Sequence, residues 1–281
     1  MIEFTKVHGN GNDFIVLDNR EARRPTAELS RLAVLLCRRK FSIGADGILV
    51  VEKADGADFA MRIFNSDGSE GEMCGNGARA VARYAFEKKL AASDMRFMTP
   101  AGSIGARVDP PFAELDMGEV ALPGSSGRIS SHGREFPYVF LTAGVPHCVL
   151  LTRDWDALDA ETKTSIGREI SHDLSRFPEG ANVSFAQALS GGSIRAVTYE
   201  RGVEELTESC GTGCVAAAVA FASPAGGAAS VTRVLNPGGV NEVRLSFDGG
   251  KTSCHAWLKG RTALVAEGRV LEDAFLEGEP S

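Results

Sequence analysis

Two stretches of the chain repeat one pattern: EMCGNGARAVARY at residues 72–84 and ESCGTGCVAAAVAF at residues 208–221. In each, a cysteine follows a glutamate by two residues and precedes two glycines and a run rich in small and apolar residues. Glycines permit a tight turn from a strand into a helix, and the run after them is typical of a buried helix. The repetition therefore predicts two halves of similar plan, each presenting one cysteine, Cys74 or Cys210, at the start of a helix.

The segments of the first half support an α/β (α+β) fold. We expect a helix over residues 26–39, with Thr26 as its cap, and we expect the helix after Cys74 to end near Lys89. Short apolar runs bounded by Gly and Asp predict strands. These runs cover residues 2–18 (two strands around a Gly/Asn-rich loop), 45–54, 58–70, 95–102, 103–109 and 112–119.

The second half repeats this order after a stretch rich in Gly, Ser and Pro at residues 121–133, which we interpret as a linker or loop. One helix is expected near residues 160–172 and another after Cys210. The expected strands cover residues 138–145, 182–188, 193–202, 230–236, 240–249, 251–260 and 262–271. An internal duplication explains this shared order better than coincidence does.

Composition and charge argue against several classes of protein. Among 281 residues, 43% are hydrophobic and 24% charged, and the net charge of −7 argues against a nucleic-acid-binding surface. The chain shows no signal peptide, and no apolar run approaches the ~20 residues that span a bilayer. We therefore expect a cytoplasmic protein that binds neither nucleic acid nor membrane. We expect its six cysteines to be free thiols. The sequence contains no CxxC pair, so a structural metal site is not expected.

A cysteine at a helix start has a definite chemical setting. The first backbone N–H groups of a helix have no partner inside it, so they can hold an anion such as a carboxylate or phosphate. The same field can lower the pKa of a thiol from about 8.5 and provide a thiolate near neutral pH. A phosphate loop is not expected, because neither motif contains the Gly-Lys-Ser/Thr sequence of that loop.

Two such cysteines could invert a stereocentre without a cofactor. If a carboxylate is held by both helix starts, one sulfur as thiolate can remove the α-proton while the other, as thiol, protonates the opposite face. The helix N–H groups would stabilise the charge that develops on the carboxylate. A single cysteine of this kind is more simply a small buried apolar residue, but the matched pair favours function. A carboxylate-binding protein without catalysis, or a redox sensor that uses the same thiol pair, is the alternative from another class.

The motifs together resemble the diaminopimelate epimerase family. The segments that carry the resemblance are HGNGNDFIVLD (8–18), FNSDGSEGEMCGNGAR (64–79), PHCV (146–149), RFPEGANVSF (176–185), YERG (199–202) and ESCGTGC (208–214). The resemblance implies a cofactor-independent, cytoplasmic homodimer that interconverts LL- and meso-diaminopimelate. It also implies two pseudo-symmetric domains, each a curved, mostly antiparallel sheet around a central helix, with the active site between them. The expected domains are residues 1–120, joined by the returning tail 267–281, and residues 121–266.

The resemblance implies a role for individual residues. Cys74 and Cys210 match the two catalytic cysteines. His147 and Glu200 match residues that tune the cysteine pair, and Glu200 also matches a residue that holds the reacting α-amino group. The remaining matches are to residues that bind the substrate: the helix-start residues Gly75, Asn76, Gly211 and Thr212, together with Asn12, Asn65, Asn182 and Arg201.

The sequence departs from the family pattern at two positions that can contact the distal end of the substrate. Gly47 stands where the family often has a glutamine, and Val145 where it usually has an asparagine. A racemase of another amino acid, such as proline, hydroxyproline or histidine, is therefore the alternative enzyme. Arg201 favours diaminopimelate, because a guanidinium can donate two parallel hydrogen bonds to a second carboxylate.

Overall fold

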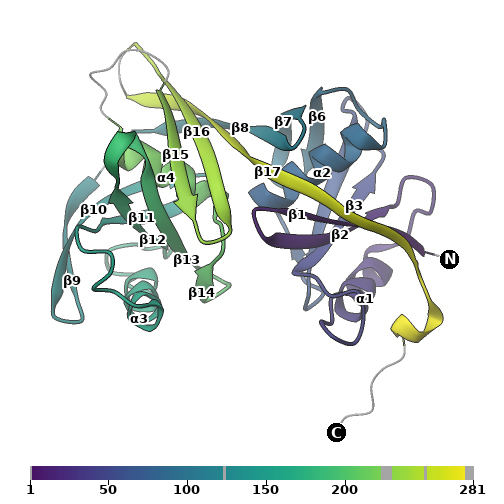
Figure 1. The fold of residues 1–281 in the computed structure, drawn as a ribbon, viewed down its shortest axis with the longest axis horizontal. Helices are drawn as coiled ribbons and strands as arrows, with labels where there is room; N and C mark the ends of the chain where they lie inside the picture. Colours follow the sequence, from purple (N-terminus) through teal and green to yellow (C-terminus); the bar gives the residue numbers. More distant parts are fainter. Residues whose placement is uncertain (1, 123–124, 223–229, 250–251, 276–281) are drawn as a thin grey trace, which may run out of the picture. The chain divides into compact units, whose positions relative to one another are not determined.

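The computed structural model describes residues 2–122, 125–222, 230–249 and 252–275, which form two compact units (Figure 1). The first unit comprises Met1–Leu115 and Gly260–Ser281, and the second comprises Asp116–Lys259. The described residues from 260 onward belong to the first unit again. The divisions fall a few residues before the expected positions 120 and 266.

The first unit is a mixed sheet with two helices, α1 (Thr26–Leu36) and α2 (Gly75–Glu87). Most neighbouring strands are antiparallel, and the pairs β2–β3 and β4–β6 are parallel. Its strands are β1 (Ile2–Gly9), β2 (Asn12–Asp18), β3 (Gly47–Glu52), β4 (Phe59–Asn65), β5 (Glu70–Gly71), β6 (Asp94–Thr99), β7 (Gly102–Asp109), the start of β8 (Phe112–Ala121) and the end of β17 (Ser253–Val270).

The strands of the second unit pair in the same order as those of the first. Hairpin β10–β11 corresponds to β1–β2, the parallel pairs β11–β12 and β13–β15 correspond to β2–β3 and β4–β6, and β15–β16 corresponds to β6–β7. Its helices are α3 (Ala160–Ser171) and α4 (Gly211–Phe221). Its further strands are β9 (Ser125–Ser131), β10 (Arg134–Ala143), β11 (Val145–Leu151), β12 (Asn182–Ala188), β13 (Ile194–Glu200), β14 (Glu205–Thr207), β15 (Ser230–Asn236) and β16 (Gly239–Phe247). The predicted fold of two halves with one plan is confirmed.

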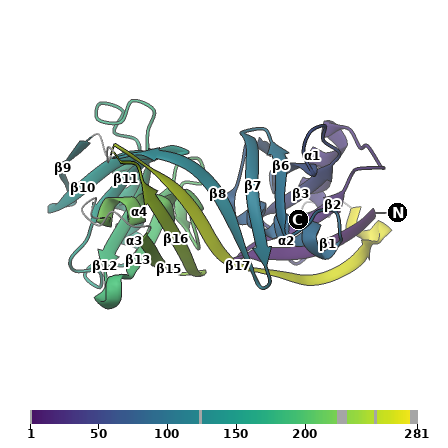
Figure 2. The ribbon, with the colours of Figure 1, turned by 90° about the horizontal axis from the view of Figure 1, so that it is seen from above.

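Each cysteine motif begins the central helix of its unit. Helix α2 contacts strands β1, β2, β3, β4 and β7, and α4 contacts β10–β13, β15 and β16 (Figure 2). The third helical residue of each is a glycine that faces the sheet at close range. A Cβ at Gly77 would lie 3.0 Å from Leu49 Cδ2, and one at Gly213 would lie 2.4 Å from Thr198 Oγ1. The second glycine of each motif therefore allows the helix start to approach the sheet closely.

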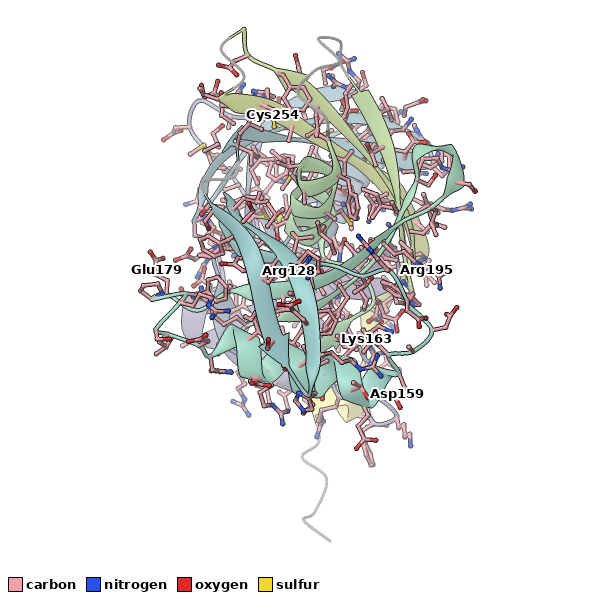
Figure 3. All side chains as sticks on the ribbon, turned by 90° about the vertical axis from the view of Figure 1, so that its left-hand side faces the viewer. Arg128, Asp159, Lys163, Glu179, Arg195 and Cys254 are labelled. Carbon is pink, nitrogen blue, oxygen red and sulfur yellow. The ribbon has the colours of Figure 1, made fainter. Side chains whose placement is uncertain are left out.

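Helix α3 follows the sequence prediction closely. Asp159 caps it by accepting a hydrogen bond from the Thr162 backbone N–H at 2.8 Å. One turn further on, Lys163 places its ammonium over the ring of Trp155, and the guanidinium of Arg195 lies over the same ring. Figure 3 labels Asp159, Lys163 and Arg195, which lie close together in that view.

Three sequence predictions about local structure were wrong. The supposed linker at 121–133 contains β9, which pairs along its length with β10. The two strands expected at 251–260 and 262–271 are one strand, β17, which continues through Gly260 from the second unit into the first. Helix α1 ends at Leu36, and Thr26 is its first helical residue, preceded by Pro25 at the cap position.

Candidate functional site

Cys74 is the cap residue of α2, with extended backbone angles (φ −137°, ψ 120°) immediately before the first helical residue, Gly75. Its carbonyl accepts the first helical hydrogen bond, from Ala78 N at 2.8 Å. Its side chain makes no capping hydrogen bond to the start of the helix. The predicted placement of Cys74 at a helix start is confirmed.

Three predicted site residues lie together in the first unit. The thiol of Cys74 donates to Oδ1 of Asn12 at 3.5 Å, and Nδ2 of Asn76 donates to the same oxygen at 3.3 Å. Asn12 begins β2, whereas Asn76 is the second residue of α2 and is almost fully buried. The hairpin and the helix start therefore meet at one amide oxygen. Arg79, also fully buried, donates from Nη2 to Oδ1 of Asn76 at 2.6 Å.

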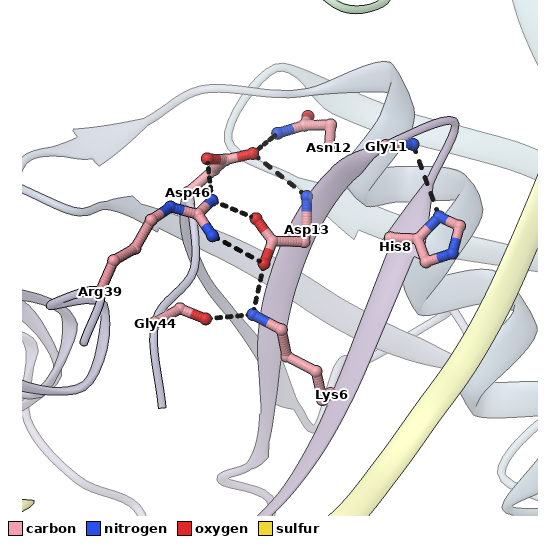
Figure 4. Close-up of polar contacts among 8 residues, drawn as sticks. All are labelled: Lys6, His8, Gly11, Asn12, Asp13, Arg39, Gly44 and Asp46. Carbon is pink, nitrogen blue, oxygen red and sulfur yellow. Dashed lines mark hydrogen bonds and ion pairs between the residues drawn. The ribbon is translucent and has the colours of Figure 1, made fainter. Parts of the chain in front are cut away.

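A cluster of charged side chains supports Asn12 from the other side (Figure 4). Asp46 Oδ2 accepts from Asn12 Nδ2 at 2.7 Å and from the Asp13 backbone N–H at 3.1 Å. Arg39 bridges Asp46 and Asp13 at 2.8 and 2.6 Å, and Lys6 pairs with Asp13 at 2.5 Å. Burial opposes ionisation of Asp13, but its hydrogen bonds to Lys6 and Arg39 prevail and lower its pKa. The loop before β3 is thereby tied to the start of β2.

Asn65, at the end of β4, has a different set of contacts. Its backbone N–H and its Nδ2 bond to the carbonyl and hydroxyl of Ser69, in the turn that leads to β5. These are the local contacts that asparagine makes in turns. Its side chain is exposed.

Cys210 holds the corresponding position in the second unit, as the cap residue of α4. Its sulfur accepts from the backbone N–H of Gly213 at 3.4 Å and lies 3.4 Å from the hydroxyl of Thr212. Unlike Cys74, Cys210 is buried, with an exposed fraction of 7%. Gly211 and Thr212 are the first two helical residues, as the motif predicts.

Glu200, the last residue of β13, is the charged neighbour of Cys210. Burial raises the pKa of Glu200, partly offset by hydrogen bonds from Thr207 and from the Cys210 thiol. The Thr207 hydroxyl donates to Glu200 Oε1 at 2.5 Å. A carboxylate with a raised pKa beside a thiol can act as a proton acceptor for that thiol.

The expected lowering of the thiol pKa is wrong for Cys210. Burial raises its pKa well above the ordinary value, and the nearby Glu200 carboxylate raises it further. Hydrogen bonds from Thr212 and Gly213 act in the opposite direction but do not prevail. Desolvation disfavours a thiolate more than one helix start favours it. The resting form of this residue is therefore the thiol.

Asn182 and Arg201 meet at the beginning of β12. Asn182 Oδ1 accepts the Arg201 backbone N–H at 2.8 Å, and Nη1 of Arg201 donates to the carbonyl of Glu179. The strand register places Asn182 opposite His147 on β11. His147 is fully buried, and neither ring nitrogen has a hydrogen-bond partner within the described part of the chain. Burial lowers its pKa to about 3, so the imidazole is neutral near pH 7 and cannot lower a thiol pKa through charge.

The departure at Gly47 has a steric cause in this chain. A Cβ at this position would lie 2.6 Å from the carbonyl oxygen of Phe64, so a glutamine would require the strands to move apart. Val145, at the start of β11, is partly exposed. Position 47 thus contributes no side chain to the site.

Sequence reasoning missed two residues that contact the predicted site, Arg79 and Thr207, and treated a third, Asp46, as a turn residue or a support behind the site. Asp46 resembles an ordinary turn residue, because it precedes Gly47 in an Asp-Gly pair. Arg79 stands between two alanines in the sequence, but only packing shows that its guanidinium is buried. Thr207 carries no motif signal.

All six cysteines are free thiols, as predicted. Among the residues that the structure describes, no group of three or more His, Cys, Asp or Glu side chains is arranged to hold a metal ion. None of the helices in the described ranges is long and apolar enough to cross a membrane.

The fold is shared with solved structures of several activities. A Bacillus anthracis phenazine biosynthesis protein of the PhzF family matches 96% of this chain and 99% of its own, with a TM-score of 0.73 and 15% identity. A probable proline racemase from Agrobacterium radiobacter K84 matches 98% of this chain and 94% of its own, with a TM-score of 0.72 and 18% identity. At these identities the likeness concerns the fold alone.

Sequence comparison identifies the family. A relative from Methanocella arvoryzae, a diaminopimelate epimerase, is 38% identical over 96% of each chain, and one from Aquifex aeolicus is 33% identical over 98% of this chain and 99% of its own. The family model for diaminopimelate epimerase matches residues 4–123 and 139–263, which include every predicted site residue. On these matches, this chain belongs to the diaminopimelate epimerase family.

Proposed function

We propose that this protein interconverts LL-2,6-diaminopimelate and meso-diaminopimelate, a step that serves lysine and peptidoglycan precursor synthesis. The observation that carries the proposal is the repeated placement of a cysteine as the cap residue of each central helix. The assignment is supported by family membership over most of the chain. Cys74 and Cys210 are the proposed acid and base, and the reaction as proposed needs no cofactor.

The mechanism requires the two thiols to reach opposite faces of one α-carbon. The backbone N–H groups of Gly75, Asn76, Gly211 and Thr212 would hold the α-carboxylate and stabilise the charge that builds on it during proton removal. One sulfur, as thiolate, takes the α-proton, and the other, as thiol, gives a proton to the opposite face. The roles exchange in the reverse direction.

Glu200 supplies the first proton transfer in the direction that uses Cys210 as base. Its carboxylate would take the proton of the Cys210 thiol, which burial otherwise keeps protonated. As its second proposed role, the same carboxylate would hold the substrate's α-ammonium group. His147, as a neutral imidazole, would act through hydrogen bonding when substrate or water reaches its buried nitrogens.

We assign the binding of the substrate's distal end to polar residues on strands and turns. Arg201 would bind the second carboxylate, with Asn65 and Asn182 completing the polar contacts there, whereas Asn12 would contact the substrate beside Cys74. Arg201 is exposed and already turned toward the carbonyl of Glu179, from which it would have to move to form a two-pronged contact.

A panel of substrates tests the proposed activity. The purified, reduced protein should convert LL-diaminopimelate to the meso isomer, and chiral chromatography of the products would measure the conversion. L-Proline, trans-4-hydroxy-L-proline and L-histidine serve as comparisons and should remain unchanged. Racemisation of one of these with no conversion of LL-diaminopimelate would replace the proposed substrate.

The protein is further proposed to act as a cytoplasmic homodimer. A hollow of about 370 Å³ in the first unit supports this, because six of its nine lining residues are apolar and exposed apolar surface of this kind is what a second copy covers. Two of its lining side chains, Phe41 and Leu271, are 78% and 62% exposed. The apolar residues that line it are Phe4, Phe41, Ile43, Val270, Leu271 and Ala274.

Phe41→Glu is expected to shift the protein from dimer to monomer, because it would bury a charge in the proposed interface. Sedimentation velocity at micromolar concentration measures the change. Leu174→Glu is the matched control, because Leu174 is a similarly exposed leucine, 59% exposed, in the second unit. A monomeric wild-type protein, or loss of the dimer in both variants, would contradict the proposed surface.

A further inference from the structure

We propose that Asp46 and Arg79 are positioning residues that fix the orientation of the Asn12 amide beside Cys74. The inference rests on the proposed function of Cys74 and goes beyond it, because neither residue belongs to the predicted site. Both act through hydrogen bonds whose direction is dictated by chemistry: a carboxylate can only accept, and a guanidinium can only donate.

Asp46 determines which end of the Asn12 amide faces the thiol. Its Oδ2 lies 2.7 Å from Asn12 Nδ2, and its Oδ1 pairs with Arg39, so the group is a carboxylate held in place by a cation (Figure 4). Because this carboxylate must accept, Asn12 must offer its NH₂ group to Asp46. The amide oxygen of Asn12 is then left facing Cys74 Sγ, at 3.5 Å.

Arg79 imposes the same orientation from the opposite side. Its guanidinium, fully buried in α2, lies 2.6 Å from Asn76 Oδ1 and must donate to it. The NH₂ group of Asn76 is therefore turned toward Asn12, where it can only meet an acceptor, at 3.3 Å. The carboxylate and the guanidinium thus act at the two ends of one chain of hydrogen bonds, and each adds to the preference for Asn12 Oδ1 at the shared position, so that removing either one weakens it.

The consequence for Cys74 is a partner that accepts and cannot donate. An amide oxygen stabilises the protonated thiol and repels the lone pairs of a thiolate. Asn12 therefore holds Cys74 as a proton donor in the ligand-free protein. Cys210 differs, because its partner Glu200 is a carboxylate that can take the proton away.

The corresponding positions of α4 carry residues that cannot make the contacts of Asn76 and Arg79. Thr212 occupies the position of Asn76, two residues after the cysteine, and Val215 occupies that of Arg79, five residues after it. Cys210 in the same molecule is therefore an internal reference for any change that is general to the fold.

Alkylation of the ligand-free protein tests this arrangement of hydrogen bonds without measuring turnover. Iodoacetamide reacts with thiolates, and mass spectrometry of the Cys74 and Cys210 peptides gives each rate as a function of pH. In Asp46→Asn the new amide can donate as well as accept, so Asn12 can turn its NH₂ group toward Cys74 and stabilise the thiolate. We expect Cys74 to react about 3- to 10-fold faster at pH 7, with the midpoint of its pH profile moved to lower pH.

Three further variants separate this role from a structural one. Asp13→Asn breaks the pairs with Lys6 and Arg39 while leaving Asp46 bonded to Asn12, so the Cys74 rate should stay at the wild-type value. Arg79→Met should raise the rate in the same direction as Asp46→Asn. Arg79→Lys, which keeps a group that only donates, should restore much of the wild-type profile. The Cys210 rate should be unchanged throughout.

Two results would overturn the proposal. One is an unchanged Cys74 profile in Asp46→Asn when circular dichroism shows an intact fold. The other is an equal change in Asp13→Asn, which would assign the effect to the ion-pair cluster in general. Failure of the epimerase activity itself would instead appear in the substrate panel, and the alkylation result does not depend on it.

Discussion

Replacing Cys210 with serine is expected to lower kcat for epimerisation by about 10²- to 10⁴-fold, and replacing Cys74 with serine should have an effect of the same order. Inversion needs a proton-transfer group on each face of the α-carbon, and a hydroxyl is a far weaker acid and base near pH 7 than a thiol. The measurement is the initial rate of meso product formation from LL-diaminopimelate. The size of the loss distinguishes an acid–base role from a small buried apolar residue, whose replacement would act mainly on stability.

Cys37→Ala provides the matched control. Cys37 is a buried free thiol that closes the C-terminal end of α1, and burial raises its pKa to about 12. Its loss should leave kcat per folded molecule unchanged. Near-normal turnover by either Cys74→Ser or Cys210→Ser would contradict the two-thiol mechanism.

Glu200→Gln is expected to lower kcat by about 10²-fold and to remove the acidic limb of the pH–rate profile. In the wild type, activity should be present above the pKa of Glu200, which burial raises above its usual 4.5, and should be lost as the pH falls through it. Glutamine keeps the shape of the side chain but cannot accept the proton of Cys210. A series of kcat values from pH 4 to 8 would measure both effects.

The same substitution should increase stability at neutral pH. Because folding raises the pKa of Glu200, this carboxyl favours the native state at low pH and costs stability once the pH exceeds its folded pKa. Glutamine removes that cost, so the urea midpoint at pH 7 should rise. Glu205→Gln is the control, since Glu205 is the exposed partner of Glu200 in the strand register. Equal losses of activity in the two variants would contradict the assigned role.

The sequence predicts those parts of the fold where side-chain patterns are strong. Strands β12 and β15 have the predicted bounds: β15 contains three β-branched residues, and β12 is a buried run that begins at Asn182. Strand β9 was missed because its Ser-rich sequence is mostly exposed, and backbone pairing with β10 makes it a strand. Gly260 suggested a break in β17, yet it lies where this strand passes from one unit to the other.

The site is predictable where it depends on local structure and not where it depends on burial. The positions of Cys74 and Cys210 follow from glycines that permit a turn into a helix. The raised pKa of Cys210 does not follow, because the helix start is a local effect and desolvation is set by the strands packed around it. Asp46 lies 34 residues from Asn12 in sequence, so only the fold brings their side chains together.

Deuterium incorporation during turnover in heavy water tests the central claim most directly. If two thiols act on opposite faces, the first meso-diaminopimelate formed from LL-diaminopimelate carries deuterium at the inverted α-carbon, while the remaining LL substrate does not. The acid that protonates the product has exchanged with solvent, whereas a proton returned to the substrate comes from the base that removed it. Product that retains its original hydrogen, or a substrate pool that gains deuterium as fast as the product does, would contradict the two-thiol mechanism.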